Sequence, residues 1–178
     1  MYVDADTYPI TDILPLYSFD EPITLFESQG NPNKRFTKRD CFLAMGLDGE
    51  RYWNATHACG RFQVFRKGDW IVDQFLQEWL TYCLNPRCQF ADFRDSAGNG
   101  PSILAPDFPE FHRHSGEQSI LTLLAEKYKV KLHREACQFG WPKQPGHGQP
   151  EDTYGQIFHQ QYCEGDRSDV SGSRFRNI

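Results

Sequence analysis

The chain has 178 residues, of which 39% are hydrophobic and 24% charged, and these proportions are typical of a globular protein with a core of its own. Its net charge of −5 argues against binding to nucleic acid or to an anionic membrane, because both need a basic face. No stretch approaches about 18 consecutive apolar residues, and no basic start leads into an apolar run, so the sequence predicts neither a membrane span nor a secretory signal.

The cysteines predict free thiols rather than a disulfide framework. None of them forms a C-x-x-C pair, and a chain of this size does not need disulfides to be stable. The sequence therefore favours a reducing, cytoplasmic location. The six positions are Cys41, Cys59, Cys83, Cys88, Cys137 and Cys163.

The first part of the chain predicts two strands and a short helix. Residues 1–5 read as a buried strand, and residues 22–27 alternate as a second strand would. Residues 28–33 read as a polar turn. A helix over 38–45 is expected to end at Gly46.

The middle of the chain contains the clearest helix signal. Residues 60–66 predict a strand, and Asp69 is placed to cap a helix over 70–84 whose apolar residues recur at helical spacing. Asn85-Pro86 is expected to end this helix.

The second half begins with a long loop, 88–114, of a kind that is often functional when it occurs in a compact domain. Ser115 is expected to open a second amphipathic helix, followed by a strand over 130–132. From Gly140 onward the sequence predicts an irregular wrap and a mobile tail. Strands that alternate with helices indicate an α/β layered domain.

Asp4-Ala5-Asp6 is the first candidate site. On a strand, residues i and i+2 point to the same face, so the two carboxylates can converge on one hard cation. Such a cation takes one or two carboxylates and completes its shell with water and phosphate oxygens. The alternative is structural, since Asp is common at strand ends, where it caps helices or forms Asx turns.

Several segments of the chain together resemble glycosyltransferases of the GT-A type. They occur in the family's order over about residues 1–160, and they imply a GT-A-like fold, a layered mixed sheet with flanking helices. The segments are 36–48 (FTKRDCFLAMGLD), 52–54 (YWN), 62–67 (FQVFRK), 75–80 (FLQEWL), 112–114 (HRH), 118–124 (QSILTLL), 127–128 (KY) and 137–140 (CQFG).

The resemblance implies transfer of a sugar from a nucleotide-sugar donor to a carbohydrate or glycoconjugate acceptor, with a divalent metal, Mn²⁺ or Mg²⁺. It makes Asp4 and Asp6 the D-x-D motif, with Asp6 on the metal and Asp4 on the metal or the ribose. His159 resembles a late histidine that supplies a metal ligand in some of these families, and imidazole is an acceptable ligand for manganese. The family often has paired histidines here, whereas this chain has His159-Gln160.

Glu117 and Gln118 stand where the family usually has Asp-Gln directly after His-Arg-His, and here Ser115-Gly116 is interposed. The resemblance makes Glu117 the catalytic carboxylate, which would deprotonate the acceptor hydroxyl or bind sugar hydroxyls. It also adds Gln118 and His114 to the cofactor-binding residues. The structural alternative is that Ser115 and Gln118 form a capping box, with Glu117 favouring the helix dipole. For His114 the alternative is hydrogen bonding within its loop.

The sequence resembles only the C-terminal portion of such an enzyme. Residues 1–160 are expected to form the catalytic and acceptor-binding portion and residues 161–178 a polar, flexible tail. The first strand would then lie at a sheet edge, and this chain alone is expected to bind a nucleotide sugar weakly or not at all.

Two other functions remain open from the sequence. One is a relative that binds carbohydrate or nucleotide without catalysis. The other is a haloacid-dehalogenase-like phosphatase, for which Asp4 and Asp6 would be nucleophile and general acid and 165–169 a late acidic motif. That motif lies in a polar tail with no strand before it, so it has no rigid platform.

Overall fold

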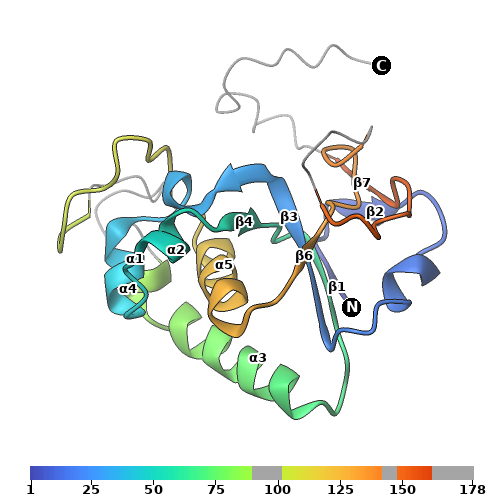
Figure 1. Cartoon of the computed structure of the whole chain (residues 1–178), viewed down its shortest axis with the longest axis horizontal. Helices are drawn as coiled ribbons and strands as arrows, with labels where there is room; N and C mark the ends of the chain where they lie inside the picture. The colour runs from blue at the N-terminus through green and yellow to red at the C-terminus, as the bar shows by residue number, and fades with distance from the viewer. Residues whose placement is uncertain (90–101, 142–147, 162–178) are drawn as a thin grey trace.

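The structure, a computed structural model, describes residues 1–89, 102–141 and 148–161. It is a mixed α/β fold in which strands and helices alternate along the chain (Figure 1). The strands are β1 (Tyr2–Val3), β2 (Thr7–Pro9), β3 (Ile23–Pro32), β4 (Thr56–Ala58), β5 (Phe62–Phe65), β6 (Leu132–His133) and β7 (Phe158–Gln160). The helices are α1 (Arg39–Ala44), α2 (Glu50–Trp53), α3 (Trp70–Cys83), α4 (Pro86–Gln89) and α5 (Glu117–Tyr128), with 3₁₀ turns η1 (Leu14–Tyr17) and η2 (Asn33–Arg35).

The long strand β3 organises a mixed sheet. It pairs antiparallel with β4 and β5 and parallel with β6, while β1 pairs antiparallel with β5. A second, two-stranded sheet joins β2 to β7. The first ten residues of the chain are thus held by strands far along the sequence.

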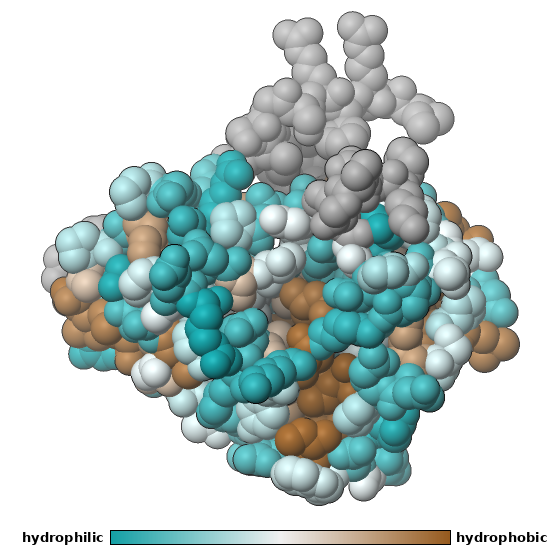
Figure 2. Space-filling model, viewed as in Figure 1, coloured by the Kyte–Doolittle hydropathy of each residue, from teal (hydrophilic) through white to brown (hydrophobic). Residues whose placement is uncertain are grey.

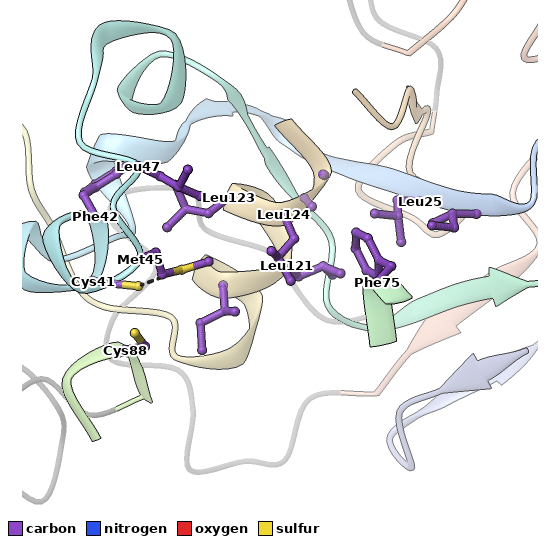
Figure 3. Close-up of a cluster of buried hydrophobic side chains, with 14 of the residues drawn as sticks. Leu25, Cys41, Phe42, Met45, Leu47, Phe75, Cys88, Leu121, Leu123 and Leu124 are labelled. Carbon is purple, nitrogen blue, oxygen red and sulfur yellow. Dashed lines mark hydrogen bonds between the residues drawn. The ribbon is translucent and has the colours of Figure 1, made fainter. Parts of the chain in front are cut away.

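Helices cover one face of the sheet, and α5 lies against β4 (Figure 1). Ile23 and Leu25 of β3 pack with side chains of α1, α3 and α5 in one buried cluster. Figure 3 shows this cluster, with Leu121 and Leu124 of α5 pointing toward Phe75 of α3. Because side chains alternate along a strand, Ile23 and Leu25 supply one face and Phe26 the other.

Irregular segments cover the opposite face. Phe26, Phe62 and Val64 form a second buried cluster with residues between 136 and 158. The rings of Phe62 and Phe158 lie 4.9 Å apart. In the part that the structure describes, the segment predicted as an irregular wrap packs against the sheet as a layer. Residues 158–160 of this segment form the strand β7.

The helix predictions agree with the structure. Asp69 accepts a hydrogen bond from the backbone N–H of Ile71 at 3.0 Å and begins α3, as its position predicted. Gly46, with φ of 67°, follows α1 and ends it. The left-handed conformation at this position explains the glycine.

Two predictions that concern the strands are wrong in detail. β1 is not buried as predicted, since Tyr2 is 51% exposed and Val3 is only partly buried. The predicted turn at 28–33 is largely the second half of β3, where the register shifts at Gln29 and Gly30, both with positive φ. The residues that favour a turn serve here as a strand irregularity.

The five cysteines among the described residues are free thiols, as predicted. No helix in these parts of the chain is long and apolar enough to cross a membrane. The predicted long loop, 88–114, is wrong at its start, because residues 88 and 89 are the end of α4, and it is next described from residue 102 onward. The predicted tail lies outside the described residues apart from Gln161.

Candidate functional site

Asp4-Ala5-Asp6 forms a turn between β1 and β2 rather than the end of a strand. The backbone N–H of Thr7 donates to the carbonyl of Asp4 at 3.0 Å, and the N–H of Asp4 donates to the carbonyl of Arg61 at 2.8 Å. The strand geometry from which convergence of the two carboxylates was predicted is therefore absent. The turn, held on β5 by the first strand, sets their positions instead.

Both carboxylates are partly buried and accept hydrogen bonds from neighbouring side chains. The Tyr2 hydroxyl donates to Oδ1 of Asp4 at 2.6 Å. Asp6 accepts from the Thr7 hydroxyl at 3.2 Å and from Nε2 of Gln160 at 3.0 Å. An ionised carboxylate offers about four lone pairs, so these bonds leave Asp4 and Asp6 able to bind a cation.

The start of α5 lies beside this turn, so Glu117 belongs to the same surface. Gly116, with φ of 49°, is the N-cap and gives no side-chain hydrogen bond, so the predicted Ser115–Gln118 capping box does not form. Gln118 turns instead to β4, where its Nε2 donates to the carbonyl of Ala58 at 2.6 Å. Glu117 is exposed, and its backbone carbonyl accepts from Nε1 of Trp79 at 3.2 Å.

The pKa of Tyr2 responds to the carboxylates of the acidic turn and to Glu117. The hydrogen bond to Asp4 raises the pKa of Tyr2 to about 12, helped by partial burial and by the negative charges of Asp4, Glu117 and Asp6. The phenol therefore stays protonated and remains a donor at neutral pH. This part of the surface is strongly negative and suits a cation.

His159 lies next to the acidic turn but does not face Asp6. In the β2–β7 pair it stands opposite Tyr8, and the two rings are 5.6 Å apart at 53°. Asp6 directly precedes β2, and His159 lies on β7, the strand that pairs with β2. The direct contact with Asp6 comes from Gln160.

His114 has a structural role in the described residues. Its Nε2 lies 2.8 Å from the carbonyl of Cys88, and its Nδ1 accepts from the backbone N–H of Lys38 at 3.2 Å. Burial lowers the pKa of His114 to about 4, so the ring is neutral at neutral pH. Its predicted contact with a cofactor stays a prediction, and we leave it out of the proposed site.

The acidic turn fits a hard divalent cation in part. Among residues 1–89, 102–141 and 148–161, no three side chains of the His, Cys, Asp and Glu types lie close enough to hold a metal ion. Mg²⁺-like ions do not need three, since one or two carboxylates with water and phosphate oxygens suffice. Gln160 adds a donor rather than an oxygen here, because its Nε2 donates to Oδ2 of Asp6 at 3.0 Å.

The sequence did not identify Tyr2 or Gln160 as members of this site. Tyr2 precedes Asp4 by two residues on an expected strand, and that spacing places both side chains on one face. For Gln160 no such signal exists, because its contact with Asp6 spans 154 residues and depends on a short strand, β7, in a segment without periodicity.

A separate hollow of about 310 Å³ lies between α5 and the sheet. Figure 2 shows this face of the molecule, where hydrophobic atoms gather near the middle and hydrophilic atoms surround them. Asp4, Asp6 and Glu117 are not among its lining residues, so the hollow does not extend the acidic turn. Polar residues that line it are Glu27, Thr56, Thr122, Glu126 and Gln149.

Comparison of the chain with family models, with curated proteins and with solved structures gives no match in any of the three. The functional assignment therefore depends on the residues themselves and their geometry.

Proposed function

We propose that this protein is part of a metal-dependent glycosyltransferase, which transfers a sugar from a nucleotide sugar to a carbohydrate or glycoconjugate acceptor. The observation that carries the proposal is the placement of Asp4 and Asp6 in one turn, where Tyr2 donates to Asp4 and Gln160 donates to Asp6. The negative charge of Glu117, from a distant part of the chain, also acts on Tyr2 and raises its pKa. The resemblance of segments between residues 36 and 140 to GT-A enzymes gives this grouping its interpretation.

The proposed roles of these residues divide between binding the nucleotide-sugar donor and activating the acceptor. Asp4 and Asp6 would hold Mn²⁺ or Mg²⁺, and a bound cation of this kind stabilises charge on the departing diphosphate. Glu117 is exposed and ionisable, so it would accept the proton of the acceptor hydroxyl. Tyr2 donates to Asp4 and limits the directions in which that carboxylate can turn.

The direct test is release of nucleoside diphosphate from a panel of uridine and guanosine sugar donors in the presence of Mn²⁺. High donor concentration is needed, because weak donor binding is expected. We expect Asp6→Asn to reduce the rate about 100-fold, equivalent to about 2.7 kcal/mol of transition-state stabilisation. Asp12→Asn is the matched control, because Asp12 is an exposed carboxylate that only accepts from the backbone N–H of Leu14.

Equal rates in the wild type, Asp6→Asn and Asp12→Asn would contradict the proposal. Hydrolysis of a generic aryl phosphate with Mg²⁺ would support a phosphatase instead. The late acidic motif of that alternative, 165–169, lies outside the described residues.

A carbohydrate-binding protein without catalysis is the second candidate. The exposed rings of Tyr2 and Tyr8, on either side of the acidic turn, favour it, because aromatic faces stack on sugars. Carbohydrate binding that persists in a double variant, Asp4→Ala with Asp6→Ala, would support this function over metal-dependent transfer.

A further inference from the structure

Glu27 occupies a position on β3 where an apolar side chain would be expected. Side chains alternate along a strand, so Glu27 lies on the same face as Ile23 and Leu25, which pack with the helices. Glu27 is nevertheless acidic, and only 7% of it is exposed. An acidic side chain thus lies in the layer between the sheet and α5.

The side of α5 that meets this part of the sheet is small or polar. Thr122, Ala125 and Glu126 are three and four residues apart, so they lie on one side of the helix. All three line the hollow of about 310 Å³, together with Glu27. Elsewhere on α5, leucine and isoleucine side chains pack in the buried cluster. The hollow therefore lies where the apolar contacts between helix and sheet stop.

The polar groups that line the hollow offer mainly hydrogen-bond acceptors. The hydroxyl of Thr122 donates to the carbonyl of Gln118 at 2.8 Å, and Nε2 of Gln149 donates to the carbonyl of Leu132 at 2.7 Å. These donors are used within the fold. Within the described chain, no lysine, arginine or histidine lines the hollow. A ligand that donates hydrogen bonds is therefore complementary to it.

The hollow combines negative charge with an apolar wall. Glu27 and Glu126 are both acidic, and Glu126 uses Oε1 to bind Nε of the exposed Arg51 at 3.1 Å. Val130 and Leu132 give it apolar surface and no oxygen ligand. This wall does not suit a Mg²⁺-like ion, which keeps several waters. It suits an organic cation, whose ammonium group donates up to three hydrogen bonds and whose apolar part is removed from water.

We propose that this hollow binds a small primary amine, whose ammonium group contacts the carboxylate of Glu27 and whose apolar part lies against Val130 and Leu132. Pockets for small molecules begin at about 300 Å³, so the hollow has room for a ligand at the small end of that range. The site is separate from the acidic turn. It needs no metal ion and does not depend on the proposed function.

The test is a titration of the full chain with butylamine, which is a cation at neutral pH, followed by nuclear magnetic resonance of the backbone amides. Butan-1-ol has a similar size but no charge, so it is the matched uncharged probe. We expect saturable shifts with butylamine at residues 55–58, 122–126 and 148–149. Affinity for butan-1-ol should be at least about 10-fold lower, because it cannot form a charge-assisted hydrogen bond.

Variants at two positions test the contact with Glu27. Glu27→Gln keeps the shape of the side chain and should lower the affinity for butylamine by about 10-fold or more. Glu50→Gln removes a charge at an exposed position outside the hollow and should keep the wild-type affinity. Thr56→Arg adds a positive charge at an exposed lining position and should also weaken binding, whereas Thr56→Gln, without a charge, should weaken it less. The two Thr56 variants decide the question if circular dichroism shows that Glu27→Gln does not fold.

Four results would overturn the proposal. They are equal affinity for butylamine and butan-1-ol, wild-type affinity in a folded Glu27→Gln, equal losses in the two Thr56 variants, and no saturation of the wild type at tens of millimolar butylamine. Shifts centred on residues 4–7 would place the amine at the acidic turn and would overturn the assignment to the hollow. Metal-dependent sugar transfer is tested at Asp6, so either proposal can fail without the other.

Discussion

Single residues at the acidic turn have different kinds of partner. Asp4 is bonded by a residue two positions away, Tyr2, whereas Asp6 is bonded by Gln160 at the far end of the described chain. The contact between Tyr2 and Asp4 could be predicted, because residues two positions apart on a strand point to the same face. The contact between Asp6 and Gln160 could be predicted only from the pairing of β2 with β7, and no pattern in the sequence indicates that pairing.

Two buried histidines make stability depend on pH. Burial is the main cause that lowers the pKa of His57 to about 3, and it lowers the pKa of His114 to about 4. In the unfolded chain a histidine titrates near 6.5. Between these values the unfolded state binds more protons, so stability is fully present above about pH 6.5 and is lost as the pH falls.

We expect the urea midpoint at about pH 5 to lie below that at about pH 7.5. His57→Gln should reduce this difference, because it removes a group that protonates on unfolding. His112→Gln changes an exposed histidine and should keep the wild-type difference. A midpoint that rises on acidification would contradict the assignment of neutral, buried rings.

At the level of elements, helices were more predictable than strands. α3 and α5 bury apolar residues at helical spacing, and Asp69 and Gly46 mark helix ends by local chemistry. The strands β2, β4 and β7 are three residues each, too short for alternation to be recognised. The N-terminus of α5 was predicted as a capping box, but tertiary contact with Ala58 draws Gln118 away.

The cap of α3 gives a test at this scale. Asp69→Ala removes the acceptor of the Ile71 N–H and should lower the free energy of unfolding by about 1 kcal/mol. Gln74→Ala, at an exposed position of the same helix, should change it by less than about 0.5 kcal/mol. Denaturant unfolding followed by circular dichroism measures both, and equal effects would show that Asp69 does not cap the helix.

At the scale of the whole molecule, the candidate site combines residues from segments that are far apart in the sequence. The first strand holds the acidic turn on β5, the α5 N-terminus brings Glu117 to it, and β7 brings His159 and Gln160. The sequence predicted the mixed α/β class and most helices, because these follow from local patterns. It did not predict the second sheet or the layer formed by residues 136–141 and 154–158, because both depend on long-range packing.

The edge position of β1 agrees with what the sequence led us to expect. Within the described residues β1 pairs with β5 and with no other strand. The acidic turn that follows it is therefore reached from an open side of the main sheet, and β2 and β7 flank it on the other.

The most direct measurement is the broadening of backbone amide resonances by a small amount of Mn²⁺, mapped residue by residue by nuclear magnetic resonance. If the acidic turn binds the ion, the strongest broadening falls on residues 4–7 and 159–161, followed by Glu117 at the start of α5. Broadening centred on the hollow near Glu27 and Glu126, or spread evenly over exposed carboxylates, would contradict the account.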